Sequence, residues 1–247
     1  MWWEPFTFEE SKWYLWRLGG AEIGICRNGK TWQGFCGNLR WENRGMECSG
    51  PVQGERPSQA APLTNVLKRK TAALKPFLPE QPFLVNLGGI KLFPNNKIAL
   101  NLELPPLLHL AAEKGGAPDI IFNFAPFILK ETWYGKNTME GVLCFSLPAN
   151  TAAPCDLAVH CSLTIYNKTK NVLELDKLPL YGSVLSVYEK DGRLFSDSPN
   201  VDALDNNFYK TVETAKKECG ALLTSGNKND PSLIVQGTRI IKNITGF

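Results

Sequence analysis

The sequence predicts a mainly β protein: an antiparallel β-sandwich with an N-terminal three-stranded meander and one C-terminal helix. Three observations lead to this fold class. Apolar and polar residues alternate in short runs, turn residues punctuate these runs, and the later strand candidates follow one another without helices between them. Apolar residues make up 43% of the 247-residue chain, which is enough to fill a core and argues against intrinsic disorder.

The N-terminal meander is predicted from two tight turns, Gly19-Gly20 and Asn28-Gly29, whose residues tolerate positive φ. Pairing outward from the first turn sets Trp16 opposite Ile23, and pairing from the second sets Ile25 opposite Trp32. Both turns therefore place one apolar set on a single face of the meander. That set is Tyr14, Trp16, Ile23, Ile25 and Trp32.

Alternation is lost over residues 37–62, which are rich in Gly, Pro, Asn and Glu. We expect a long loop there, with a short strand near Arg40-Trp41. The segment 67–87 is ambiguous, because its first half fits a helical turn whereas the prolines after Lys75 favour extended chain. The predicted division is a Trp-rich meander and loop over residues 1–60 and a sandwich with its helix over 61–247, unless the two form one continuous domain.

The remaining strands are predicted from short apolar runs between turns, with a loop from His109 to Pro118. Asp191-Gly192 is expected to form a further two-residue turn that places Tyr188 opposite Phe195. The strand candidates are 90–93, 98–104, 119–124, 126–134, 141–147, 156–167, 172–180 and 183–189.

The C-terminal helix is predicted to begin at Asp205, which can cap it, and to end near Ser225-Gly226. Apolar residues recur within it at spacings of four and three, as on one face of a helix. These residues are Phe208, Val212, Ala215, Cys219 and Leu222.

Side-chain alternation assigns faces to the strands around residues 127–147 and 156–167. It predicts that Trp133 points into the core and Tyr134 points outward, and that Cys144 and His160 also point outward. A Cys144 nucleophile with His160 as its base would make the protein a cysteine-dependent hydrolase or a redox-responsive protein. Because any solvent-facing sandwich strand presents a similar mixture of side chains, this function is the alternative hypothesis.

Aromatic residues give the main functional hypothesis. Six of the seven tryptophans fall in the first 41 residues, and Trp2, Trp3 and Trp41 lie outside the register of the meander. Together with Tyr134 these are the candidate binding residues, because Trp and Tyr on an open β-face stack against sugar rings or partner side chains. In the competing interpretation, the Trp-rich face of the meander packs against the main sandwich, since a three-stranded meander alone is marginal.

Composition and motifs argue against several other classes of function. The net charge is only +3, and the one basic run, residues 68–70, has no aromatic residues beside it, which argues against a nucleic-acid ligand. The opening MWWEPF lacks the pattern of a signal peptide, and no apolar stretch approaches the length of a membrane span. We expect neither a leader nor a membrane-spanning segment.

The seven cysteines include no CxxC pair, and neither of the two histidines has a ligand-like partner at metal spacing. We therefore expect no metal and no cofactor, reduced cysteines and a cytoplasmic location. His109 is interpreted as a half-buried packing residue rather than a ligand.

Several segments resemble an uncharacterised prokaryotic family, a domain of unknown function. They are the N-terminal tryptophans with the following hairpin, PFLPEQPFLV, TWYG…GVLCFSL and the later KLPLYGSVLSVY. The resemblance covers roughly residues 1–195 and implies an independent single-chain protein, with no catalytic residue and no known ligand. The sequence as a whole predicts a non-enzymatic binding or scaffold protein that uses aromatic residues on a β-face or loop to bind a glycan or a protein.

Overall fold

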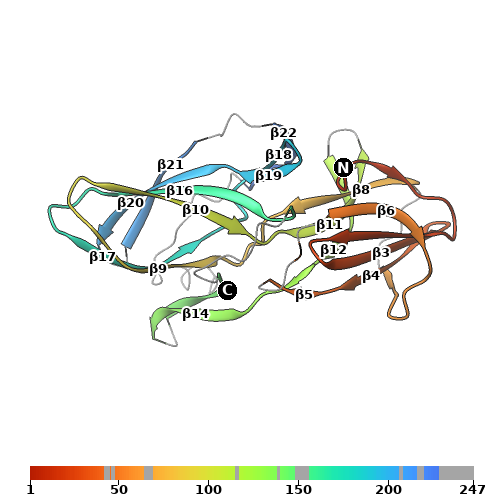
Figure 1. Cartoon of the computed structure of the whole chain (residues 1–247), viewed down its shortest axis with the longest axis horizontal. Helices are drawn as coiled ribbons and strands as arrows, with labels where there is room; N and C mark the ends of the chain where they lie inside the picture. Colours follow the sequence, from red (N-terminus) through yellow and green to blue (C-terminus); the bar gives the residue numbers. More distant parts are fainter. Residues whose placement is uncertain are drawn as a thin grey trace, which may run out of the picture.

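The computed structural model describes the chain except for residues 42–44, 46–47, 64–68, 115–116, 138–139, 148–155, 206–207, 216–219 and 228–247. The described residues form 22 strands arranged in several sheets, most of them antiparallel, in a sandwich-like architecture (Figure 1). The mainly β fold class predicted from the sequence is confirmed.

One half of the elongated molecule, the N-terminal lobe, contains two antiparallel sheets (Figure 1). The five-stranded sheet has the order β6 (Cys48–Gly54), β2 (Trp13–Leu18), β3 (Ala21–Asn28), β4 (Thr31–Gly37) and β7 (Ala61–Leu63). The four-stranded sheet has the order β1 (Phe6–Thr7), β8 (Thr71–Phe77), β11 (Leu107–Lys114) and β12 (Ala117–Phe124).

The other half, the C-terminal lobe, is built around β16 (Val159–Asn167). A seven-stranded sheet runs β21 (Phe208–Ala215), β20 (Ser198–Asp205), β16, β19 (Arg193–Ser196), β18 (Val187–Lys190) and β22 (Ala221–Thr224), with β10 (Lys97–Leu104) also paired to β16. A four-stranded sheet runs β14 (Glu131–Asn137), β15 (Glu140–Ser146), β9 (Phe83–Leu92) and β17 (Leu173–Leu180).

The chain passes between the lobes three times. It leaves the N-terminal lobe after β8 to form β9 and β10, returns for β11 and β12, and leaves again for β14 onward. Where it leaves the second time, β13 (Phe127–Ile128) pairs in parallel with β5 (Leu39–Arg40). Buried apolar side chains from both lobes form one continuous core.

The sheet of the meander does not stop at residue 60. Its edge strand β7 comes from residues 61–63, and β1 pairs with β8, which sets Phe6 opposite Ala72. Strands on both sides of the predicted division therefore share the same two sheets of the N-terminal lobe.

The predicted meander is present as β2, β3 and β4. Trp16 faces Ile23 as expected, whereas the pairing register after the second turn is shifted by two residues, so that Trp32 faces Arg27 instead of Ile25. The tight turn there falls on Gly29 and Lys30, because Asn28 already pairs with Thr31. A shift of two residues keeps every side chain on its predicted face, since the side-chain period of a strand is two. All five predicted apolar residues of that face are buried.

Two segments predicted as loops contain strands. The 37–62 region includes the predicted short strand β5 but also β6, which pairs along β2. The predicted loop from His109 to Pro118 is largely β11 and the beginning of β12. Gly and Pro punctuation marks possible bends, but it does not exclude pairing where a neighbouring strand supplies the hydrogen bonds.

The predicted C-terminal helix is wrong, because the described residues of that segment form strands and no helix. Residues Phe208–Ala215 and Ala221–Thr224 are strands, and the first of them pairs with β20. The segment FYKTVETA is rich in aromatic and β-branched residues, which fit a pleated sheet. Spacings of three and four in a short apolar set do not by themselves distinguish the two structures, and pairing to β20 decides for the strand.

Candidate functional site

The tryptophans proposed as an open binding platform lie inside the protein. The side chains of Trp2 and Trp3 are 5% and 6% exposed, and that of Trp41 is 2% exposed. The prediction that these three tryptophans form an exposed binding platform is therefore wrong. They pack inward, as in the competing interpretation.

Trp2 and Trp3 belong to a core in which aromatic rings pack between the two sheets of the N-terminal lobe. Phe8 and the ring of Phe6, in β1, contact the buried face of the five-stranded sheet, with ring centroids 5.0 Å apart for Phe8 and Trp32 and 4.6 Å apart for Phe6 and Tyr14. Trp16 belongs to the same cluster, and its indole Nε1 donates a hydrogen bond to the carbonyl of Trp2. Edge-to-face rings of this kind fill a sandwich core well.

Trp41 is buried for a second reason, because it lies next to the short parallel pair of β5 and β13. Its ring meets that of Phe127 edge to face, with centroids 4.7 Å apart. The contact lies where the chain leaves the N-terminal lobe, so Trp41 serves the packing of that junction.

Cys144 and His160 do not form a nucleophile and base pair. Cys144 is on β15 of the four-stranded sheet in the C-terminal lobe, and His160 is on β16 of the seven-stranded sheet. The His160 ring instead packs against Phe195, with centroids 5.5 Å apart. A cysteine nucleophile requires its base within hydrogen-bond reach, and the placement on separate sheets does not provide this.

The Cys144 thiol is also in an unsuitable environment for a nucleophile. Its side chain is 0% exposed, and burial raises its pKa to about 12. The Sγ atom lies 3.6 Å from the carbonyl oxygen of Val142. Thiolate is the reactive form, and low pKa values arise in electropositive, partly exposed sites rather than in apolar ones.

His109 is a packing residue, as predicted, although it is more deeply buried than expected. It is 5% exposed and its ring packs against Phe77, with centroids 5.2 Å apart. Burial, together with the nearby Lys75 ammonium, lowers its pKa to about 4. The imidazole is therefore neutral at physiological pH, held between β8 and β12.

The β14–β15 hairpin presents the opposite faces from those predicted. Trp133 is 47% exposed and its cross-strand partner Leu143 is 43% exposed, whereas Cys144 is buried and Tyr134 is half-buried. The outward set of Glu131, Trp133, Leu143 and Phe145 is called the hairpin face. Within it Glu131 is exposed and Phe145 is half-buried.

The Trp133 indole lies over Gly141 on the neighbouring strand. A Cβ atom at position 141 would come within 2.6 Å of both the indole Cε2 and the Tyr134 carbonyl oxygen. Glycine is therefore required for the ring to lie close to the strand, which holds the indole in place beside Leu143.

The hairpin extends away from the body of the molecule along the lower side of Figure 1. β15 pairs with β9 only at Phe145 and Ser146, near its end, and β14 is the outer strand of this sheet. Among the described strands, β14 is paired only with β15. The hairpin therefore combines exposed apolar side chains with an edge strand, whose backbone groups can pair with another chain.

Alternation missed the hairpin face because burial changes along the strand. Leu147 is 9% exposed and Phe145 half-buried near the β9 contact, whereas Leu143 on the same predicted side is exposed farther out. A period of two identifies which residues share a face, but not which face the rest of the protein covers. Gly141 pairs with Gly135, two residues after Trp133. This glycine is the one local signal in the sequence that the Trp133 ring lies against β15.

Two hollows lie elsewhere on the surface. One, of about 320 Å³, is bordered by Arg69, Lys70 and Thr71 next to β1. The other, of about 610 Å³, lies beside the β9–β10 turn and is bordered by Phe93, Lys97 and Tyr166. Neither hollow contains a residue of the hairpin face.

Among the described residues, no group of three His, Cys, Asp or Glu side chains is arranged to hold a metal ion. No helix in this part of the chain has the length and apolar character required to span a bilayer.

The model of a family described as protein of unknown function (DUF432) matches residues 2–239. Neither the curated proteins nor the solved structures contain a significant match.

Proposed function

The chain belongs to the DUF432 family of proteins of unknown function, and we propose that it is a non-enzymatic binding protein that contacts a protein partner through the hairpin face. The observation that carries this proposal is the exposure of Trp133 at 47% beside Leu143 at 43%, while the other six tryptophans are buried. Tryptophan is enriched among the residues that dominate binding energy at protein interfaces.

Two features favour a protein partner over a glycan. The side chain directly opposite Trp133 is the aliphatic Leu143, which offers no hydrogen bond to a sugar hydroxyl. The outer strand β14 adds a row of backbone donors and acceptors, to which an extended peptide can bind by strand addition. Tyr134, the remaining predicted binding residue, is half-buried on the opposite face and would support the hairpin rather than contact the partner.

The same hairpin does not favour the enzymatic alternative. Cys144 is buried on its inner face with a pKa raised to about 12, and His160 belongs to another sheet. We propose that Cys144 has a structural role, in which its thiol fills space between the hairpin and the body of the protein.

Trp133 provides its own probe for a direct test. Because the other six tryptophans are at most 8% exposed, acrylamide should quench mainly Trp133 emission. Peptides selected on the protein from a random linear display library should protect this emission from quenching. Trp133→Ala and Leu143→Ala should each weaken peptide binding at least tenfold, about 1.4 kcal/mol.

Val52→Ala is the matched control, because Val52 is 55% exposed on the N-terminal lobe. It should leave the peptide affinity unchanged. Selected peptides that bind without protecting Trp133, or protection by members of a glycan panel instead of peptides, would overturn the proposed protein partner.

We propose that the protein acts in a reducing compartment such as the cytoplasm. The five described cysteines, Cys26, Cys36, Cys48, Cys144 and Cys161, are all free thiols, which supports this location. Fractionation of cells that produce the tagged protein, with thiol titration of the recovered chain, tests the compartment and the redox state together.

A further inference from the structure

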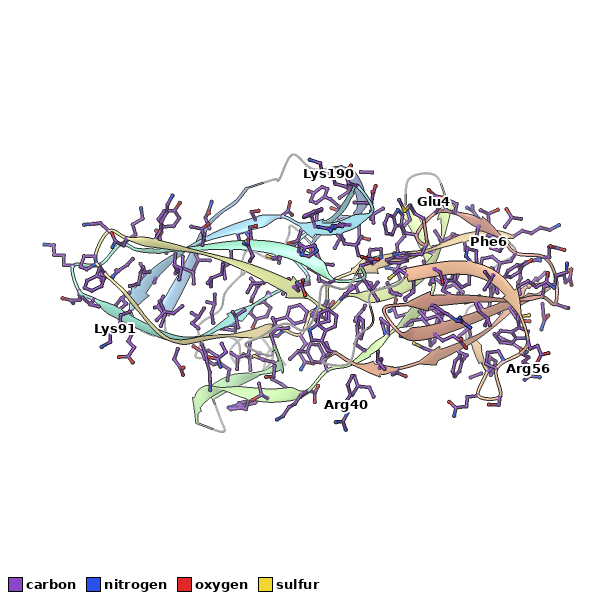
Figure 2. All side chains as sticks on the ribbon, in the orientation of Figure 1. Glu4, Phe6, Arg40, Arg56, Lys91 and Lys190 are labelled. Carbon is purple, nitrogen blue, oxygen red and sulfur yellow. The ribbon has the colours of Figure 1, made fainter. Side chains whose placement is uncertain are left out.

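A second surface lies at one end of the long axis, where the β9–β10 turn meets the loop between β16 and β17 (Figure 1). It is formed by residues 90–98 and 166–174 and is called the lobe tip. Figure 2 labels Lys91 on it. The tip lies beside the 610 Å³ hollow and contains no residue of the hairpin face.

Asn167 ties the two segments of the tip together. It is 0% exposed, and its Nδ2 donates hydrogen bonds of 2.8 Å to the carbonyls of Leu92 and Asn171. Its Oδ1 accepts hydrogen bonds from the Thr169 amide and hydroxyl at 2.9 and 2.8 Å. The main chain of Asn167 is also bonded to the β9–β10 turn, through the Asn95 amide and the Asn96 carbonyl.

This rigid base carries exposed apolar side chains. Phe93 is 58% exposed and Val172 is 48% exposed. Leu92 pairs with Leu173, so Phe93 and Val172 follow one position farther out on the two adjoining segments. Exposed apolar side chains at the end of a molecule contribute nothing to its core, and such side chains often mark an interaction site.

The tip also carries the net charge of the protein. It contains Lys91, Lys97, Lys168 and Lys170 against the single acidic residue Glu174, a net charge of +3. The whole chain has a net charge of +3, so the charges elsewhere sum to zero. The ammonium groups of Lys97 and Lys168 lie 5.7 and 5.2 Å from the centroid of the Tyr166 ring, which places both beside the hollow.

We propose that the lobe tip docks the protein on the surface of an anionic membrane. In this arrangement Phe93 and Val172 enter the boundary between headgroups and acyl chains, and the surrounding lysines contact acidic headgroups. An exposed valine contributes nothing to binding a soluble polyanion, whereas it adds apolar area at a bilayer surface. The prearranged loops also limit the conformational entropy lost on docking.

Cosedimentation with vesicles tests the proposal. The full-length protein should bind large vesicles of phosphatidylcholine with about 40 mol% phosphatidylglycerol, bind poorly to phosphatidylcholine alone, and dissociate as salt screens the charges. Lys97→Gln with Lys168→Gln should weaken binding about twentyfold, because each lysine near such a surface contributes about fivefold. Phe93→Ser should weaken binding about tenfold.

The matched control variants carry the same kinds of substitution at positions outside the lobe tip. Lys190→Gln with Arg193→Gln removes the same charge from an exposed hairpin, at the place where Figure 2 labels Lys190, and Val52→Ser removes an apolar side chain from the other lobe. Both controls should bind anionic vesicles like the unaltered protein. Thermal unfolding verifies that every variant is folded.

Three results would overturn the proposal. The first is no binding to anionic vesicles, and the second is equal binding to both kinds of vesicle. The third is tighter binding to heparin or to a single-stranded oligonucleotide that is unaffected by Phe93→Ser, since this would assign the lysines to a soluble polyanion. Trp133→Ala should leave vesicle binding unchanged, which separates this surface from the hairpin face.

Discussion

At the scale of single residues, environment rather than residue type decides chemistry in this protein. Cys144 and His109 are types that often act in catalysis, yet burial places both in their neutral forms at physiological pH. Desolvation disfavours a thiolate and an imidazolium alike, so the pKa of the thiol is raised and that of the imidazole is lowered. Both residues contribute packing.

The Cys144 thiol should resist modification in the folded protein. With a pKa of about 12, only roughly one thiol in 10⁴ is ionised at pH 8, and the side chain is also inaccessible. Labelling with a maleimide followed by peptide mass spectrometry should modify Cys144 only when the protein unfolds. Cys48, which is half-buried, is the internal comparison. Rapid native labelling of Cys144 would restore the enzymatic hypothesis.

His109 should make stability depend on pH in acid. Its pKa is lowered from 6.5 to about 4, so the unfolded chain takes up the proton first as the pH falls. Its stabilising contribution is complete above pH 6.5 and is lost as the pH falls towards 4. Between pH 7 and pH 5 this amounts to about 2 kcal/mol of the free energy of unfolding.

Urea titrations at pH 7 and pH 5 measure this decrease in the free energy of unfolding. His109→Phe keeps an aromatic ring against Phe77 and should remove most of the pH dependence, whereas the control His160→Gln should retain it. An unchanged pH dependence in His109→Phe would show that another group is responsible.

At the scale of elements, hairpins follow local rules, but their orientation depends on what they are attached to. The turn at Asp191-Gly192 places Tyr188 opposite Phe195, as predicted from the sequence. The β14–β15 hairpin has the pairing of two strands around a turn, yet its outward face is the one predicted to be inward. Contact with β9 at only two positions leaves Trp133 beyond the region where another sheet could cover it.

Gly141→Ala should disturb this hairpin specifically. The added methyl group would collide with the Tyr134 carbonyl oxygen and the Trp133 ring, so we expect a loss of about 1–3 kcal/mol in the free energy of unfolding. The displaced indole should also change its emission and its quenching by acrylamide. Gly37→Ala is the control, because its methyl group would approach the end of the Phe35 side chain at 3.3 Å and the Glu22 carbonyl oxygen at an ordinary contact distance of 3.6 Å. Equal effects of the two substitutions would contradict the close approach of Trp133 to Gly141.

At the scale of the whole molecule, the three passages of the chain between lobes join the two halves into one core. β8, β11 and β12 complete the N-terminal lobe, and β8 is separated in sequence from the other two by β9 and β10 of the C-terminal lobe. Thr224 near the end of the described chain donates a hydrogen bond to the carbonyl of Pro76 in β8, which adds a further tie between the lobes. Neither lobe is a continuous segment.

A fragment of residues 1–63 should therefore not fold by itself. It contains in sequence the strands of the five-stranded sheet but lacks β8, β11 and β12, against which their aromatic face packs in the full chain. Its near-ultraviolet circular dichroism should be flat, and addition of a fragment of residues 64–247 should restore the signal. In the full chain, tryptophan emission and far-ultraviolet dichroism should report one coincident urea transition. Two separate transitions, or a folded 1–63 fragment, would contradict the shared core.

The sequence by itself determined the elements whose information is local. The positive-φ turns at Gly19-Gly20 and Asp191-Gly192 set the strand pairing beside them, and the period of two placed Trp16 and Ile23 on a buried face. The mainly β class and the resemblance to an uncharacterised family follow from such patterns repeated along the chain. Turn geometry and side-chain alternation act over a few residues, so a sequence expresses them directly.

Only the tertiary structure decided what covers each face. Pairing to β20 made residues 208–215 a strand, packing in the core buried Trp2 and Trp3, and the limited contact with β9 exposed Trp133. The lobe tip likewise exists because Asn167 bonds to Leu92, 75 residues away in sequence. Burial and proximity depend on long-range contacts, and the free energy of these contacts overrides the weak local preferences that a sequence displays.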